Sequence, residues 1–416
     1  MKYCRIVIYL VWACCLITPT FASERDCQET SALLELTSKL RRLAVVKEVP
    51  CKLQNIIEVE NYLKKQIQNK GILKQIQYEE TVFKMIGIIP EDYSYTQGLI
   101  NMYTSQLAGY YDKDNKFYAM ADWISPSMQL PITVHELVHS LQDQHYNLHK
   151  ILEEEPITTD EMLARLALAE GDASAVMYDY LNKKRGLPSL AEQNNISSFA
   201  LSNMLGAIIS TNTVAAPKAL QVLLVYPYIS GLSFVHMLLL QNGYQAVDAA
   251  YLNLPRSTQE ILHPEKYLSR INNPRQLATA LNSQLQESIP RLLNQKYRLP
   301  SVYSDTLGEF MISSLLNNFL SPIVASQASI GWKYDRLDLY QLQENPKKFL
   351  LAWTIIMENP DDAEVLFNSL LKVYSERFYQ NLRKNKDTLY FKNNITNTVG
   401  YLVRESPTRV RIEITS

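Results

Sequence analysis

Apolar residues recur every three or four positions through much of this chain, a spacing that predicts amphipathic helices. The pattern extends from Thr30 to Ile88, with charged residues at the intervening positions. It recurs from Leu130 to Leu148 and from Asp160 to Lys184. We therefore expect a helical N-terminal segment, residues 23–95, followed by two long helices.

Between these regions the pattern changes to that of strands. Leu107–Tyr111 and Lys116–Met120 are rich in apolar and aromatic residues, and the polar run Asp112–Asn115 separates them. Two strand-like runs joined by a short polar turn predict a β-hairpin. Its outer strand would offer an edge to which an extended peptide can add.

The stretch Val222–Leu240 contains no formal charge and resembles a membrane span in composition. Pro227, Ser230 and Gly231 interrupt it, and His236 adds an ionisable group. Ionisable residues are rare in the bilayer interior. We expect a buried helix pair near the protein centre, with a membrane span as the alternative.

From Asp305 onward, helical and strand-like segments alternate, which predicts an α+β domain over residues 301–416. Helices are predicted at Leu307–Phe319 and Asp361–Phe378, and strands at Gly331–Tyr340, Phe349–Met357, Val399–Val403 and Val410–Ile414. The chain as a whole is predicted to be α+β and mainly α.

Composition narrows the class of protein. The 416 residues are enough for two or three domains. A hydrophobic content of 47% and a charged content of 20% are those of a globular chain with a sizeable core. The net charge of -1 gives no electrostatic basis for binding nucleic acid or an anionic membrane surface.

The first residues follow the pattern of a secretory signal peptide. Lys2 and Arg5 make a basic start, and Ile6–Ile17 is an uncharged apolar run. That run is shorter than the roughly 20 residues of a spanning helix, which weighs against the alternative of an uncleaved anchor. We expect residues 1–22 to be removed before Ser23. The mature chain would be periplasmic or extracellular, with no stable membrane span.

Cysteine usage agrees with export. Only Cys27 and Cys51 remain once residues 1–22 are removed. Two cysteines in an oxidising compartment can pair. We predict a disulfide between them, whereas two unpaired thiols would fit a cytosolic protein.

The run His135-Glu136-Leu137-Val138-His139 has the pattern H-E-x-x-H. Histidines four residues apart share one helix face, and neutral imidazoles are good ligands for Zn²⁺. Glu136 lies about 100° further round the helix, close to the metal without needing to bind it. There it can take a proton from an activated water and pass it to a leaving amine. The alternative is a pair of ordinary helix histidines.

Two residues compete as the third ligand. Glu170 lies on the next predicted helix, and His145 follows His139 by six residues. His145 could bind only if the helix broke just after His139, at Gln142. A non-glycine residue in the required left-handed conformation costs about 1–2 kcal/mol. We therefore favour Glu170.

Hydrolysis also benefits from a donor aimed at the developing oxyanion. Candidates are Tyr228, His236 and His263, and we select His263 as the additional catalytic residue. Asp143, four residues after His139, is placed to hydrogen-bond a ligand histidine. A solvated carboxylate is the alternative role for Asp143.

Three runs form a recognisable set: His135–His145, Glu170–Ala173 and Ser257–Pro264. With Gly331-Trp332 and Asp335-Arg336, they resemble a group of secreted bacterial proteins that is similar to the gluzincin zinc metallopeptidases. The resemblance covers most of the chain after residue 100. The gap between the H-E-x-x-H run and Glu170 is longer than in the best-known gluzincins.

The resemblance implies a gluzincin-like core over residues 96–300. It implies that His135, His139 and Glu170 bind zinc and that Glu136 is the general base. We therefore expect an exported zinc peptidase acting on a peptide or protein substrate. The alternatives are a non-catalytic metal-binding interaction protein and a zinc hydrolase of a non-peptide envelope substrate.

Overall fold

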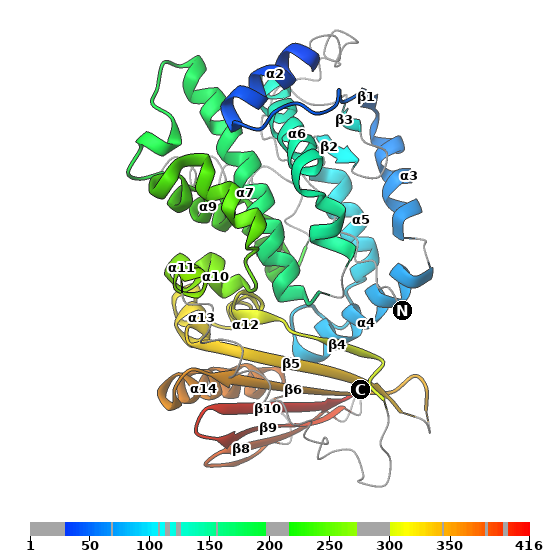
Figure 1. Cartoon of the computed structure of the whole chain (residues 1–416). Helices are drawn as coiled ribbons and strands as arrows, with labels where there is room; N and C mark the ends of the chain where they lie inside the picture. Colours follow the sequence, from blue (N-terminus) through cyan, green and yellow to red (C-terminus); the bar gives the residue numbers. More distant parts are fainter. Residues whose placement is uncertain are drawn as a thin grey trace.

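The computed structural model describes residues 30–67, 70–106, 109–112, 117–121, 126–154, 157–196, 216–272, 300–342, 345–378, 382–393 and 398–416. The upper part of the molecule is mainly helical, and the lower part contains a large sheet with helices beside it (Figure 1). The chain is therefore α+β and mainly α, as predicted. The predicted signal peptide and Cys27 lie outside the described residues, whereas Cys51 is disulfide-bonded.

The helical half is formed by elements from the first two thirds of the chain. They are α2 (Thr30–Arg41), α3 (Ile56–Ile67), α4 (Lys70–Ile86), α5 (Tyr95–Gln106), α6 (Pro126–Tyr146), the π-helical turn η1 (Lys150–Glu154), α7 (Thr159–Lys184), the 3₁₀ turn η2 (Leu190–Glu192), α9 (Lys218–Leu252), α10 (Thr258–Leu262) and α11 (Pro264–Asn272). The two long helices predicted around the H-E-x-x-H run are confirmed as α6 and α7.

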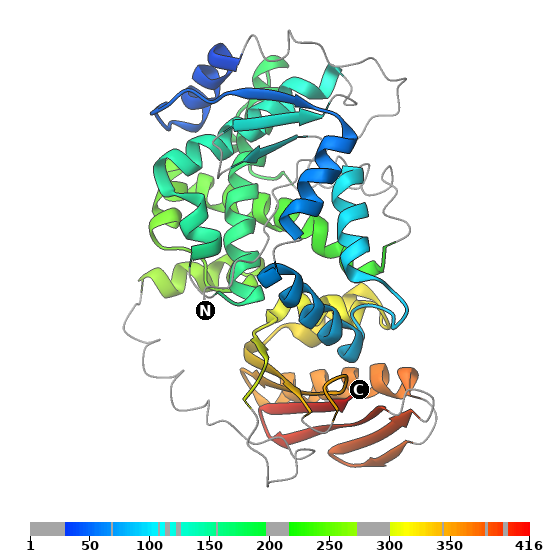
Figure 2. The same cartoon turned by 90° about the vertical axis from the view of Figure 1, so that its right-hand side faces the viewer.

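The predicted hairpin is confirmed as β2 (Gly109–Asp112) and β3 (Phe117–Ala121), which pair antiparallel. A third strand, β1 (Cys51–Gln54), pairs parallel with β3 and leaves β2 at an edge (Figure 2). The prediction of an all-helical N-terminal segment was wrong here. The short polar run of β1 is strand because β3, some 65 residues away, supplies its hydrogen-bond partners.

The apolar stretch around Val222–Leu240 lies within α9. This helix is long and apolar enough to cross a membrane, yet half of its most apolar window is buried inside the protein. Non-helical dihedrals at Asn242 and Gly243 divide it into two helical pieces, and Gly243 has a φ of +56°.

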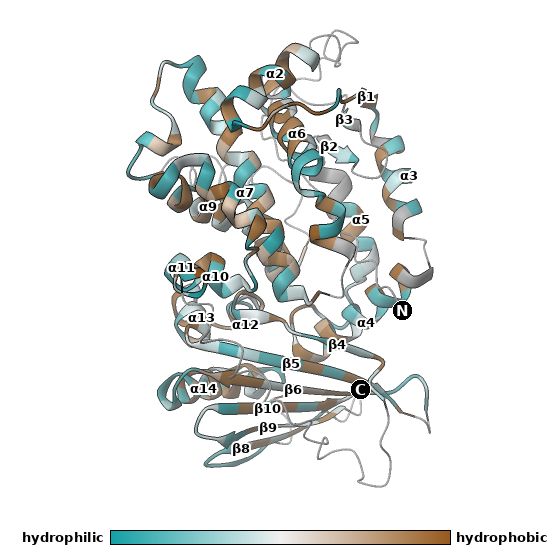
Figure 3. Cartoon of the chain, in the orientation of Figure 1, coloured by the Kyte–Doolittle hydropathy of each residue, from teal (hydrophilic) through white to brown (hydrophobic). Residues whose placement is uncertain are grey.

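The C-terminal part contains the helices and strands predicted there. The helices are α12 (Gly308–Asn317), α13 (Pro322–Ser329) and α14 (Pro360–Arg377), and the strands are β4 (Tyr303–Asp305), β5 (Trp332–Gln341), β6 (Phe349–Met357), β7 (Arg383–Asn385), β8 (Thr388–Asn393), β9 (Thr398–Ser406) and β10 (Arg409–Thr415). The seven strands form one antiparallel sheet in the order β4-β5-β6-β10-β9-β8-β7. β6 is hydrophobic over nearly its whole length because it lies at the sheet interior (Figure 3).

Buried carboxylates connect this sheet to the helices. Asp335 of β5 accepts hydrogen bonds from the backbone amides of Leu307 and Gly308 and from two indole groups. Asp305 of β4 accepts from the backbone amide and the hydroxyl of Thr159, the first residue of α7. The start of α7 is therefore fixed against the C-terminal sheet.

α6 is packed on two sides. One side faces α7, and the other faces α2 and the small sheet. The second contact is an apolar cluster to which Leu34 contributes from α2, Tyr118 from β3, and Leu137 and Leu141 from α6. The helix with the H-E-x-x-H run is therefore held in the middle of the helical half.

α7 and α9 cross in direct backbone contact. A Cβ atom added to Gly171 would lie 2.2 Å from the carbonyl carbon of Gly231, and one added to Gly231 would lie 2.0 Å from the carbonyl oxygen of Ala167. Only glycine permits this approach. The crossing places α9 beside Glu170, the residue that precedes Gly171.

Candidate metal centre

His135, His139 and Glu170 come together between α6 and α7. Nε2 of His135 lies 3.0 Å from Oε2 of Glu170 and 3.0 Å from Nε2 of His139. Nε2 of His139 lies 3.5 Å from the same oxygen. Three ligands arranged tetrahedrally around zinc, each about 2.0–2.1 Å from it, are separated by about 3.3 Å. The donor atoms are therefore of the types that bind zinc, and their separations are close to those of three ligands in a tetrahedral zinc site.

All three side chains are almost wholly buried, with at most 1% of their surface exposed. Charged groups are rarely buried without compensation. Among the described residues, this is the group of histidine, cysteine and acidic side chains placed to hold a metal ion.

Glu136 is also fully buried, and neither of its carboxylate oxygens makes a hydrogen bond of favourable geometry to the described residues, although the backbone amide of Tyr111 lies near them. Burial raises the pKa of Glu136 to about 8, although the His139 charge and the nearby Tyr111 amide lower it in part. Buried polar groups are nearly always hydrogen-bonded. A buried carboxyl group with so little hydrogen bonding indicates a site that a polar ligand completes.

The orientation of His139 is fixed by Gln142. Nδ1 of His139 lies 2.9 Å from Oε1 of Gln142, whose Nε2 donates to the carbonyl of Ala169 and to Oδ2 of Asp172, each at 3.0 Å. Because the amide nitrogen already has two acceptors, the amide oxygen faces the imidazole. His139 then carries a proton on Nδ1 and directs Nε2 toward His135 and Glu170, with which it forms the candidate metal group. Ligand histidines are oriented in the same way.

Burial and mutual contact shift the pKa values of His135, His139 and Glu170. Burial alone would lower the pKa of His139, but the Glu170 carboxylate outweighs it and raises this pKa to about 9. Burial lowers the pKa of His135 more than the neighbouring carboxylates raise it. Burial would raise the pKa of Glu170, yet the two imidazoles hold it below its ordinary value. Without a cation, a proton on His139 balances the Glu170 charge.

Two further features border the metal group. Tyr228 of α9 lies with its ring centroid 6.2 Å from that of His135, one helical turn before Gly231. The edge strand β2 lies along α6, and the Tyr111 hydroxyl donates to Asp143 at 2.9 Å. The phenol of Tyr228 and the strand β2 therefore both lie near the helix that carries His135 and His139.

His145 is not part of the metal group. α6 continues unbroken through Gln142 to Tyr146, and Nε2 of His145 lies 2.7 Å from the carbonyl oxygen of Ala44. The helix therefore points His145 toward the N-terminal segment, and Glu170 is the residue that lies with His135 and His139.

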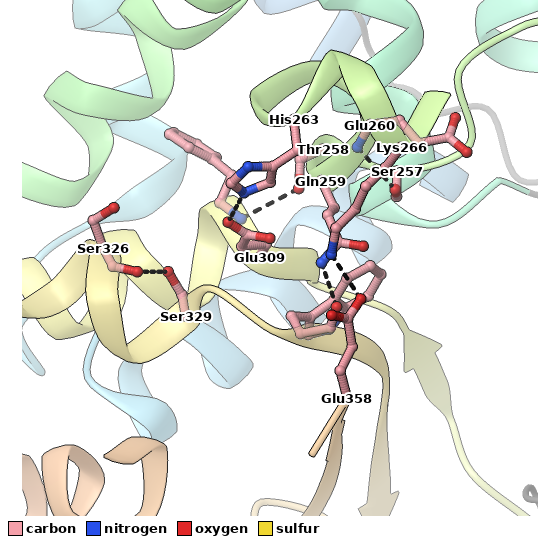
Figure 4. A network of polar contacts seen from close by, with 12 residues as sticks. Ser257, Thr258, Gln259, Glu260, His263, Lys266, Glu309, Ser326, Ser329 and Glu358 are labelled. Carbon is pink, nitrogen blue, oxygen red and sulfur yellow. Dashed lines mark hydrogen bonds and ion pairs between the residues drawn. The ribbon is translucent and has the colours of Figure 1, made fainter. Parts of the chain in front are cut away.

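His263, selected from the sequence as catalytic, lies elsewhere. It follows α10, and its Nε2 lies 2.7 Å from Oε1 of Glu309 on α12 (Figure 4). In the same short helix, Thr258 binds Asp160 near the start of α7. Glu170 is ten residues further along α7, about 15 Å at 1.5 Å per residue. In this structure His263 joins α10 to α12 through Glu309, and its catalytic role stays a prediction.

Two other sequence-based roles are also reassigned. Nε2 of His236 lies 2.7 Å from the Gln193 carbonyl, which makes it a buried structural histidine. Asp143 accepts from the Tyr111 hydroxyl and from the Leu148 amide. Gln142 takes the role proposed for Asp143, and its spacing of three from His139 was a signal available in the sequence.

Comparison of the chain with protein-family models, with curated proteins and with solved structures gave no match. The proposals below therefore depend on the geometry and chemistry of this chain alone.

Metal affinity is expected to rise with pH. Because a ligand imidazole must be neutral, the proton that His139 holds below about pH 9 competes with the metal. Displacement of one proton predicts an affinity for zinc that increases about tenfold per pH unit below this value and then levels off. Chelator competition between pH 6 and 9 measures the slope, and a flat profile would contradict the protonated state of His139.

Proposed function

We propose that the chain is an exported zinc-dependent peptidase with a gluzincin-like site, in which His135, His139 and Glu170 bind zinc and Glu136 is the general base. The observation that supports it most strongly is the combination of a His-His-Glu donor set at zinc spacing with a buried, unpaired carboxylate beside it. The disulfide bond of Cys51 supports an oxidising compartment outside the cytoplasm.

The donor set favours zinc. Two imidazoles and one carboxylate are typical of catalytic zinc sites that leave a fourth position open. Magnesium and calcium prefer oxygen ligands throughout. When bound, zinc would supply Lewis acidity to a substrate carbonyl and make water nucleophilic near pH 7.

Residues of the chain would then supply proton transfer, a donor to the oxyanion and a surface that binds the substrate. Glu136 accepts a proton from water as the oxygen attacks the peptide carbonyl, and it transfers this proton to the amine nitrogen as the C–N bond breaks. The hydroxyl of Tyr228 is the candidate donor to the oxyanion, replacing His263. The edge of β2 offers backbone groups to an extended substrate.

One observation favours a second candidate. The three ligands and Glu136 are nearly inaccessible to solvent, which suits a hydrolase of a small non-peptide substrate. Cleavage of internal bonds in an unfolded protein would support the peptidase. Turnover restricted to small esters or amides would support the second candidate.

Purified protein is expected to contain about one zinc ion per chain. Glu170→Ala removes a ligand and should empty the site, whereas His145→Ala is the matched control because Nε2 of His145 faces the Ala44 carbonyl and not the His-His-Glu group. Metal content by mass spectrometry measures both variants. Wild-type protein without metal, or loss of zinc in His145→Ala alone, would overturn the assignment.

Glu136→Gln is expected to retain zinc and lose about 10²–10⁴-fold in turnover, because an amide cannot accept the proton from water. The substitution keeps the size of the side chain. Digestion of a peptide library gives the rate, and metal analysis of the same sample confirms occupancy. Unchanged turnover would exclude Glu136 as the base.

Tyr228→Phe is expected to lower kcat about 10²–10³-fold with little change in zinc content, since it removes one donor to the oxyanion. His263→Ala is the control, and it should keep kcat near the wild-type value because the contact of His263 is with Glu309. The opposite ranking of the two variants would restore His263 as the catalytic residue.

A further inference from the structure

A buried arginine from the N-terminal segment lies close to the metal centre. Arg41, the last residue of α2, has none of its side-chain surface exposed. Its Nε lies 2.6 Å from Oδ1 of Asp172 on α7, and Nη2 lies 2.8 Å from Oδ1 of Asp248 on α9. These are ion pairs by distance and not hydrogen bonds of favourable angle. The guanidinium of Arg41 is therefore held by electrostatic attraction to the two carboxylates.

Asp172 connects this arginine to a metal ligand. While Oδ1 of Asp172 faces Arg41, its Oδ2 accepts from Nε2 of Gln142 at 3.0 Å and from the Tyr251 hydroxyl at 3.1 Å. Gln142 in turn presents its amide oxygen to Nδ1 of His139. The series Arg41–Asp172–Gln142–His139 is therefore continuous, and every member is buried.

The same arginine contacts the helices that surround the site. Its guanidinium carbon lies 4.8 Å from the ring centroid of Tyr244 on α9. Asp248, its second partner, accepts at 2.7 Å from the hydroxyl of Tyr146 at the end of α6, and Tyr146 stacks on Tyr251 with centroids 4.2 Å apart. Arg41 thus joins α7 and α9 directly and α6 through Asp248.

The segment after Arg41 is fixed to the end of α6. Oε1 of Gln144 accepts from the backbone amides of Val46 and Lys47 at 2.8 and 2.9 Å, and its Nε2 donates to the Lys47 carbonyl at 3.0 Å. His145 binds the Ala44 carbonyl from the same turn. A few residues later β1 joins the small sheet beside β3. These contacts belong to an integral part of the fold and not to a loosely attached covering.

We propose that Arg41 is a positioning residue of the metal centre, acting through Asp172 and Gln142 on the orientation of His139, and that the N-terminal segment carrying it is a permanent part of the site. The inference depends on the proposed metal centre. It predicts that the segment supports metal binding and is not an inhibitory prodomain to be removed.

The test is a double-mutant cycle on the full chain, read as zinc affinity by chelator competition. Arg41→Met should weaken zinc binding about 10–100-fold, the range for loss of a group that orients a ligand. Gln142→Leu should have a similar effect. Because both act on His139 through one series, the double variant should bind zinc no more weakly than Gln142→Leu alone.

The visible spectrum of the cobalt-substituted protein provides a second readout that a purely structural role would not change. Arg41→Met at saturating cobalt should shift the ligand-field bands, since the His139 ring is no longer held by Gln142. Arg41→Lys keeps the charge but cannot serve both carboxylates, and it should show an intermediate loss of zinc affinity. This variant also keeps the test usable if Arg41→Met does not fold.

Arg411→Met is the matched control. Arg411 is a similarly buried arginine, paired with Glu413 at 2.8 Å in the C-terminal sheet. It should lower thermal stability without changing zinc affinity or the cobalt spectrum. Wild-type protein that binds no zinc would refute the metal centre itself. A wild type that binds zinc, with affinity unchanged in Arg41→Met or Arg41→Lys or with additive losses in the double variant, would refute only the role of Arg41.

Discussion

Four ionisable side chains, His135, Glu136, His139 and Glu170, are removed from water between α6 and α7. Taking such groups out of water costs several kcal/mol each unless opposite charges and hydrogen bonds compensate. The surrounding helices supply only part of that compensation, since the oxygens of Glu136 make no hydrogen bond of favourable geometry to the described residues. A cation at the His-His-Glu group would offset much of the remaining cost, so stability of the apo protein and metal binding should be closely coupled.

Helix packing decides how closely the site residues approach one another. The glycine contact between α7 and α9 brings two backbones together, and this places Tyr228 of α9 beside His135 of α6. The position of α6 is also fixed by packing, because α2 and the small sheet contact it in addition to α7. The site is therefore a product of three helices whose relative positions are set by apolar and backbone contacts outside it.

The C-terminal sheet affects the site indirectly. Its carboxylates Asp305 and Asp335 bind the start of α7 and the loop before α12, respectively, and so fix one end of the helix that carries Glu170. His263 belongs to this supporting region, where it joins α10 to α12 (Figure 4).

Local spacing along the chain determined the central features of this protein. His135, Glu136 and His139 follow from helical periodicity, and the unbroken pattern through Gln142 already disfavoured His145, because both depend on neighbours within one or two turns. The fold class and most elements follow for the same reason. Tertiary structure alone decided the rest: the pairing of β1 with β3, the approach of Tyr228 to His135, and the burial of Arg41 against Asp172. Each of these joins segments tens to hundreds of residues apart, and no periodicity in the sequence records which distant surfaces will meet.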